Sequence, residues 1–241
     1  MSIDKNKWIL QMKTTEDENY MLPLFSFVFN FFEEIFGTST MNSEPCILYN
    51  NGEANYPMLI INKNPIQIRT SAENLSFWSQ FIYQLSHEMT HYVIRQYKTA
   101  IVKWFEETVC EAMSLYILHV SSVRWTECDL YPINFCYGKS LECYWKNEYE
   151  QTEDSVLKHC HTIHELELIE EKCETNRKGR SIERNYLFDT FCVMPSSIAE
   201  FVYYPLYMSG NLQIDFDSWE SKQENNMLIP HLKTMHPELT A

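Results

Sequence analysis

Residues 78–93 read WSQFIYQLSHEMTHYV and decide how the middle of this chain folds. Asn74 or Ser76 can cap the start of a helix here, because both side chains accept hydrogen bonds from free backbone amides. We therefore predict an amphipathic helix that runs to about Gln96. Its apolar stripe recurs at the three-and-four spacing of a helix, at Trp78, Phe81, Ile82, Leu85, Met89, Tyr92 and Val93.

His87, Glu88 and His91 lie on this predicted helix in the pattern H-E-x-x-H. At about 100° per residue, the two imidazoles project from nearly the same side, opposite to the apolar stripe. Such a pair can chelate one divalent ion, and the carboxylate beside the first histidine can reach a water at that ion. We predict a zinc site facing a cleft, with Glu88 as general base. The alternative is a solvated helix face that carries two histidines.

A catalytic zinc takes a third protein ligand and keeps one position for water or substrate. Segment 104–114 supplies carboxylates on a second predicted helix. Glu107 and Glu111 lie one turn apart and share a face, whereas Glu106 points about 100° from Glu107 and is expected to be solvated. An ordinary acidic amphipathic helix would also fit this segment. Its core stripe would be Val109, Met113, Tyr116, Ile117 and Val120.

These two segments together resemble the gluzincins, the zinc metallopeptidases related to thermolysin and to the alanyl-type aminopeptidases. In that family H-E-x-x-H supplies two ligands, and a Glu on a following helix supplies the third. Glu111 lies twenty residues after His91, the separation found in thermolysin, and starts a similar Glu-Ala pair. Glu107 ends the run Trp104–Glu107, which resembles the W-x-x-E of the aminopeptidases. The resemblance therefore offers two candidates for the third ligand.

Glu107 is the candidate that we prefer, with Glu111 as the acid that orients a ligating histidine. An acid four residues after the ligand Glu has that role in thermolysin-like and neprilysin-like enzymes, and here both acids share one helical face. The sixteen-residue separation from His91 is short for the aminopeptidase pattern, so Glu111 stays the alternative ligand.

Three short segments rich in Ile and Leu precede the H-E-x-x-H helix and are predicted strands: Cys46–Tyr49, Met58–Ile61 and Ile66–Thr70. Turn-forming residues at 50–52 and 62–65 separate them. In gluzincins a small sheet precedes the active-site helix, and its edge strand pairs with the extended substrate. The resemblance implies that Ile66–Thr70 is that edge.

The predicted fold class is α+β: a small antiparallel or mixed sheet, the H-E-x-x-H helix, the Glu helix, and then a mostly helical C-terminal lobe. We divide the chain into lobes at 1–122 and 123–241, within one compact catalytic domain. Beyond residue 122 the resemblance fades. Ser155–Cys173 is the clearest periodic run there, and a later helical segment lies around Pro195–Tyr207.

Composition limits the possible partners and the compartment. The 241 residues are 45% hydrophobic and 15% aromatic, which suffices for a sizeable core. A formal charge of -14 argues against nucleic acid, and the basic cluster Arg177–Arg180 is predicted to be a solvated turn. Met21–Phe36 is too short and too interrupted to span a bilayer and is predicted to be a buried helix, so no membrane partner is expected. The absence of C-x-x-C among eight cysteines and of a secretory start favours a cytoplasmic protein with reduced thiols.

Other histidines and tyrosines are weaker candidates. His161 and His164, one turn apart beside His159 and Cys160, could in principle hold a second metal, but a partly exposed helix face is the expected reading. Gluzincins also use a downstream His or Tyr to stabilise the oxyanion, and no motif selects among the residues available here. These residues are Tyr186, Tyr203, Tyr204, His231 and His236.

The resemblance implies a zinc-dependent peptidase with Zn²⁺ as cofactor and a peptide or protein as substrate. The Gly-rich exopeptidase motif is absent near Ile66–Thr70, which favours an endopeptidase. Two other classes stay open. One is a zinc-binding, non-proteolytic interaction or regulatory protein with a similar fold. The other is a helical scaffold without metal.

Overall fold

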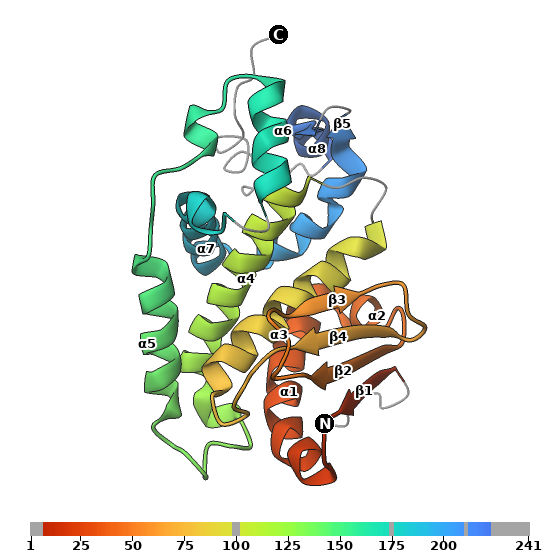
Figure 1. Cartoon of the computed structure of the whole chain (residues 1–241), viewed down its shortest axis with the longest axis vertical. Helices are drawn as coiled ribbons and strands as arrows, with labels where there is room; N and C mark the ends of the chain where they lie inside the picture. Colours follow the sequence, from red (N-terminus) through yellow and green to blue (C-terminus); the bar gives the residue numbers. More distant parts are fainter. Residues whose placement is uncertain (1–6, 98–101, 174–175, 210–211, 223–241) are drawn as a thin grey trace. The chain divides into compact units, whose positions relative to one another are not determined.

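The structure, a computed structural model, describes residues 7–97, 102–173, 176–209 and 212–222. By compactness the chain divides into two units, each built from two separate stretches (Figure 1). Unit 1 comprises Met1–Val93 and Met113–Asn147, and unit 2 comprises Ile94–Ala112 and Glu148–Ala241.

Unit 1 holds the sheet and the helices packed on it. Its elements in chain order are β1 (Trp8–Gln11), α1 (Thr15–Phe36), α2 (Thr38–Met41), β2 (Cys46–Asn50), β3 (Met58–Ile60), β4 (Ile66–Thr70), α3 (Trp78–Ile94), the second half of α4 (Lys103–Val123), η2 (Trp125–Glu127) and most of α5 (Tyr137–Glu150).

Unit 2 is mainly helical within the described residues. Its elements are η1 (Arg95–Tyr97), the first half of α4, η3 (Leu157–His159), α6 (Ile163–Lys172), η4 (Lys178–Arg180), α7 (Ser181–Val193), η5 (Pro195–Tyr207), β5 (Met208–Ser209), β6 (Gln213–Ile214) and α8 (Phe216–Lys222).

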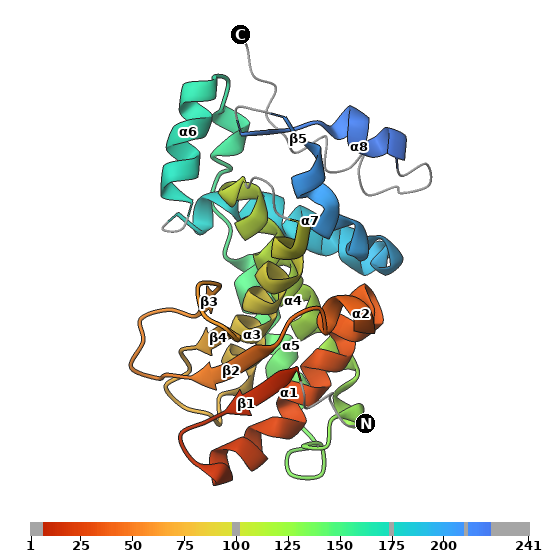
Figure 2. The ribbon, with the colours of Figure 1, turned by 90° about the vertical axis from the view of Figure 1, so that its right-hand side faces the viewer.

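The sheet of unit 1 is small and mixed, with the strand order β1-β2-β4-β3, which can be followed in Figure 2. β1 and β2 are parallel, as are β2 and β4, whereas β3 and β4 are antiparallel. The predicted α+β class is therefore confirmed, as are the three predicted strands. β1 was not predicted. Its parallel pairing with β2 requires a crossover connection, which α1 and α2 provide.

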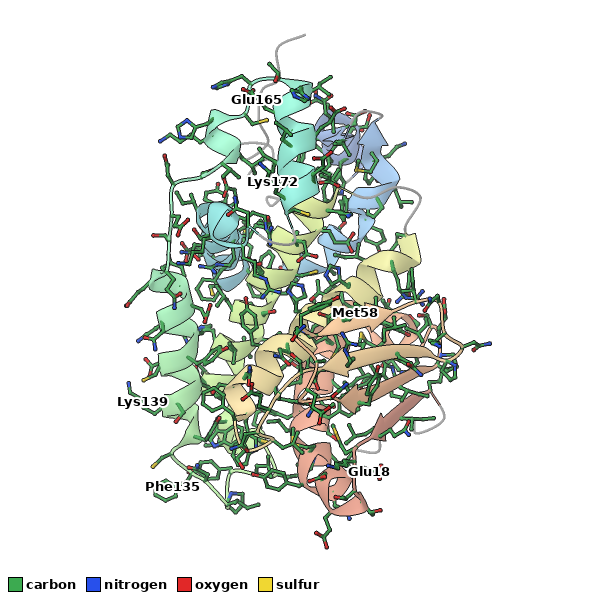
Figure 3. The ribbon with its side chains drawn as sticks, viewed as in Figure 1. Glu18, Met58, Phe135, Lys139, Glu165 and Lys172 are labelled. Atoms are coloured by element: carbon green, nitrogen blue, oxygen red, sulfur yellow. The ribbon has the colours of Figure 1, made fainter. Side chains whose placement is uncertain are left out.

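The prediction that Ile66–Thr70 is the edge strand is wrong. The turn after β3 folds the chain back, so that Met58 pairs with Arg69 and Ile60 with Gln67. β4 thereby lies between β2 and β3, with backbone partners on both sides. The edge next to β4 is the three-residue strand β3, on which Figure 3 labels Met58.

One face of the sheet packs on α1 and α3 (Figure 1). Trp8 of β1 lies at the centre of this contact, with its ring 5.3 Å from Phe29 of α1 and 5.0 Å from Tyr92 of α3. Its indole Nε1 donates a hydrogen bond of 2.7 Å to the Met41 carbonyl. The ring fills apolar space and its polar edge is satisfied, as burial of a tryptophan requires.

Helix α1 contains the predicted buried helix Met21–Phe36 but begins six residues earlier, at Thr15. Thr14 caps it by accepting a hydrogen bond from the Asp17 amide. Gly37 ends it with a φ of 81°, a conformation that only glycine adopts without steric cost. The helix thus begins before its apolar run because the capping side chain of Thr14, and not hydrophobicity, sets its start.

The predicted run Ser155–Cys173 is divided in two. Thr162 and Glu165 form a capping box, which satisfies the first free amides and starts α6 at Ile163. Residues 157–159 form the separate short helix η3. Figure 3 labels Glu165 and Lys172 near the two ends of α6. The segment Pro195–Tyr207 is helical as predicted, but as a 3₁₀-helix.

Substitution of Trp8 tests this account of the unit 1 core. Trp8→Ala should lower the free energy of unfolding by about 3–5 kcal/mol, because it removes a large buried ring and the contact that joins β1 to two helices. Ile9→Ala on the same strand is the control, since Ile9 is 46% exposed, and it should cost less than about 0.5 kcal/mol. Urea unfolding measures both; equal losses would contradict the assignment of Trp8 to the core.

Candidate metal centre

Helix α3 is buried on both of its faces. The predicted apolar stripe is confirmed, with all seven of its side chains buried. Tyr92 anchors it by donating a hydrogen bond of 2.8 Å to the Glu44 carbonyl. The opposite face is also enclosed, with only 5% of His87 and 4% of Glu88 exposed, while His91 is half-buried. The solvated-face alternative for this segment is therefore wrong.

Asn74 acts just before α3. Its side-chain oxygen accepts a hydrogen bond of 2.8 Å from the Ser76 amide, and its carbonyl accepts one of 3.0 Å from Phe77. These bonds form a turn that leads into the helix, which begins at Trp78. Asn and Asp side chains commonly stabilise such turns by bonding the backbone two residues on.

His87 and His91 come together as two ligands of one metal would. Their Nε2 atoms lie 3.2 Å apart, and their rings meet at 70° with centroids 4.9 Å apart. Two nitrogen ligands of a tetrahedral zinc, each about 2.0–2.1 Å from the ion, are separated by about 3.3–3.4 Å. The two lone pairs can therefore meet on a single zinc with little movement. If one Nε2 carries a proton instead, the rings form a hydrogen bond.

Glu88 follows His87 directly and lies in the same enclosed surface. Its carboxylate forms no hydrogen bond or ion pair with any of the residues that the structure describes. Neither of its oxygens is among the fully buried side-chain atoms that lack a partner, so the carboxylate keeps access to solvent although the residue is only 4% exposed. A water held beside the two imidazoles would be a suitable partner for Glu88.

Glu111 is held by a buried arginine within unit 2. Arg180 Nη2 lies 2.8 Å from Glu111 Oε1 and 4.0 Å from Glu107 Oε2. Only 1% of the side chain is exposed for both Arg180 and Glu111. The prediction of a solvated turn is thus wrong for Arg180. The local sequence looks like a surface turn, and the buried charge of Arg180 is compensated only by the distant acids of α4.

Glu106 also differs from its prediction, because it is buried and not solvated. Its Oε2 accepts a hydrogen bond of 2.8 Å from the hydroxyl of Tyr204 in η5. Burial, and next the nearby Glu106 carboxylate, raises the pKa of Tyr204 well above its ordinary value. Tyr204 is therefore a neutral donor to Glu106 in the folded protein.

The start of α4 is tied to α6. The Glu170 carboxylate accepts hydrogen bonds from the amides of Lys103, at 2.7 Å, and Trp104, at 3.1 Å. This distant carboxylate does the work of a capping side chain, and a negative charge is favourable at a helix N-terminus. Glu107 and Glu111 consequently project from a helix whose start is fixed.

Cys110 lies on α4 between these two acids and was not considered as a ligand from the sequence. It is a buried free thiol, and a thiolate is among the preferred donors of zinc. Its place one turn after Glu107 is the signal that could have identified it. Cys110 is the residue of α4 that groups with His87 and His91 as a potential metal ligand, whereas Glu107 and Glu111 are candidates by donor type and spacing alone.

The histidines of the second cluster are exposed, as expected, but they do not share a helix face, because α6 begins only at Ile163. His159 Nε2 lies 2.9 Å from Asp154 Oδ2, and His164 Nδ1 lies 3.6 Å from Glu167 Oε2. These are surface contacts of side chains more than half exposed. Within residues 157–173, His159, His161 and His164 take part in no group of potential metal ligands.

The oxyanion candidates are dispersed in unit 2. Tyr204 is engaged by Glu106, the ring of Tyr203 lies 4.9 Å from that of Tyr97, and Tyr186 is exposed. His231 and His236 lie outside the described residues. The positions of these residues do not identify any one of them as the group that stabilises the oxyanion.

Comparison with known proteins finds no matching family model, no matching curated protein and no matching solved structure. Among the described residues, no helix combines the length and apolar character needed to cross a membrane. All eight cysteines are described, and all are free thiols.

Replacement of Tyr204 tests the Glu106 contact and its pH dependence. At pH 8, Tyr204→Phe should lower the free energy of unfolding by about 1–3 kcal/mol, because Glu106 loses a buried donor. The raised pKa keeps the native phenol protonated, whereas the unfolded phenol ionises near pH 10. Above about pH 10, wild type therefore becomes less stable, because only its unfolded state releases the Tyr204 proton, and the Phe variant has no such proton. The difference in unfolding free energy between wild type and variant should shrink by about 1.4 kcal/mol at pH 11.

Denaturant unfolding at pH 8 and 11 measures both effects. Tyr186→Phe, at an exposed tyrosine of the same unit, is the control and should stay near wild type. A pH-independent difference between wild type and Tyr204→Phe would show that the phenol titrates normally.

Proposed function

We propose that this chain is a zinc-dependent metallopeptidase. His87 and His91 would bind the zinc, Glu107 would supply the third ligand, and Glu88 would act as general base. The observation that carries this proposal is the pair of Nε2 atoms 3.2 Å apart, next to a buried carboxylate without a described partner. Donor type, spacing and enclosure all fit zinc.

When bound, zinc polarises a substrate carbonyl and makes water a stronger acid. The residues of this chain supply the proton transfers. Glu88 takes a proton from the attacking water and passes it to the amine of the leaving peptide, so one water is consumed for each peptide bond broken. Its burial strengthens its interaction with the reacting groups, because little solvent screens the charge.

The substrate that we propose is an extended peptide. The backbone of β4 is occupied on both sides, so strand addition would use the outer edge of β3. β3 is three residues long and its side chains are half-buried, so it could pair with only a short stretch of peptide. An endopeptidase that reads a few residues around the cleaved bond fits this edge.

A second candidate is a zinc-binding protein without peptidase activity. The observation that favours it is the burial of His87 and Glu88, because a substrate carbonyl must reach the metal. A structural zinc site is closed, whereas a catalytic one keeps an open position. Half-burial of His91 favours access from its side of the helix, which supports the peptidase.

Metal analysis tests the site itself. Protein purified without added zinc should carry one zinc per chain by mass spectrometry, and His87→Ala or His91→Ala should lose it because each removes one ligand. His119→Ala is the control, since His119 is another half-buried histidine of unit 1. Loss of zinc in that variant, or its absence from wild type, would contradict the assignment.

The same zinc measurement ranks the third donors. Glu107→Gln should weaken zinc binding more than Glu111→Gln or Cys110→Ala, because only a direct ligand contributes a metal bond. A larger effect of Glu111→Gln or Cys110→Ala would transfer the ligand role to that residue.

Glu88→Gln separates metal binding from catalysis. The variant should keep its zinc and lose chelator-sensitive cleavage of a mixed peptide library by about 100- to 10,000-fold, because glutamine cannot take the proton. Glu73→Gln, at an exposed position before α3, is the control and should cleave normally. Cleavage retained by Glu88→Gln would remove the general base. Zinc without cleavage in wild type would establish the non-proteolytic candidate.

A further inference from the structure

Arg180 is a buried cation that the sequence-based assignment of the site does not use. Its guanidinium group lies against the face of α4 that carries Glu107 and Glu111, at 4.0 Å and 2.8 Å. A second terminal nitrogen, Nη1, donates to the carbonyl of Cys173, at the end of α6. Arg180, the last residue of η4, thus links the C-terminal end of α6 to the acids of α4.

The turn before Arg180 is built for close packing. A Cβ on Gly179 would lie 2.6 Å from Asn176 Nδ2 and 2.8 Å from Val156 Cγ1, so a larger residue would push these two side chains aside. The Gly179 carbonyl also accepts a hydrogen bond of 3.1 Å from the Val156 amide. This arrangement fixes the backbone of η4 and directs Arg180 inward.

Two carboxylates one helical turn apart repel each other, and the repulsion grows when water is excluded. Arg180 compensates this charge. It holds Glu111 by a charge-assisted hydrogen bond and attracts Glu107 at 4.0 Å, beyond hydrogen-bond distance. Arg180 therefore stabilises the charge of Glu107 at a longer distance than that of Glu111.

Glu111 has one oxygen on Arg180, and its other oxygen, Oε2, is buried and accepts no hydrogen bond within the described parts of the chain. A buried acceptor of this kind calls for a partner. A metal ion or the N–H of a ligating imidazole would satisfy it, and both belong to a zinc site. The fixed ion pair sets the direction in which this oxygen points.

We propose that Arg180 is a positioning residue for the zinc site: through Glu111 it orients the carboxylate face of α4 for metal binding. This inference rests on the proposed function. It gives Arg180 no contact with substrate and no part in proton transfer. Its effect should therefore appear first in zinc affinity, which is measured without any peptidase assay.

The test is the dissociation constant for zinc, measured by competition with a chelator on the full chain. Arg180→Gln should weaken zinc binding by about 10- to 100-fold, the usual effect of removing a group that orients a ligand. Arg180→Lys, which keeps the charge but loses the planar fork, should recover part of the loss.

Arg184→Gln is the matched control. Arg184 is also a buried arginine of unit 2, but it donates to Asn185 Oδ1 and to the Glu148 carbonyl. Both Gln variants remove a buried guanidinium and both should lower stability. Only Arg180→Gln should change zinc affinity. An equal loss of affinity in the two variants would reduce Arg180 to a structural role and overturn the proposal.

A double-mutant cycle with Glu111→Gln tests the route of the effect. If Arg180 acts through Glu111, the double variant should bind zinc no more weakly than the weaker single variant. Independent, multiplying losses would overturn the proposal. Where Arg180→Gln does not fold, Arg180→Met combined with Glu111→Leu replaces the pair by apolar groups and should show the same loss.

The two proposals fail in different ways. If wild type binds no zinc, the proposed function fails and this inference fails with it. If wild type binds zinc and Arg180→Gln binds it equally well, the zinc site stands and the role of Arg180 is overturned.

Discussion

Charge inside this protein has to be compensated, and that requirement organises the first half of α4. Two buried carboxylates of this helix have partners that are distant in the sequence: Glu111 has Arg180, and Glu106 has Tyr204. Leaving either of them buried and unpaired would be costly. The half-buried Glu170 of α6 adds hydrogen bonds to the amides at the start of α4. Together these contacts fix the rotation and the start of the helix that carries Glu107.

Glu88 is a buried residue beside two imidazoles, and its carboxylate has no partner among the described residues. This setting supports the general base that we propose. The Nε2 atoms of the two imidazoles lie 3.2 Å apart, and an acid directly beside them is the arrangement on which the proposed zinc site rests. The packing of α3 through Tyr92 and its apolar stripe supports this arrangement by fixing the helix from the other side.

Local rules predicted much of unit 1. The three-and-four spacing of residues 78–93 and the short runs bounded by turn residues gave a helix and three strands close to those observed. β1 was not predicted, and the edge strand was misplaced because strand order depends on long-range pairing. In unit 2, Glu106 and Arg180 were expected in solvent. Their burial depends on partners 98 and 69 residues away in the sequence, which no local pattern contains.

By itself, the sequence determined the α+β class, the helix that carries His87, Glu88 and His91, and the shared face of Glu107 and Glu111. Helical periodicity sets all of these, because it depends only on spacing along the chain. Only the tertiary structure decided that the histidine rings meet at 3.2 Å, that β3 is the edge next to β4, and that Arg180 serves the acids of α4. These features depend on which distant groups satisfy buried charge and backbone hydrogen bonds, and that choice is made when the chain packs.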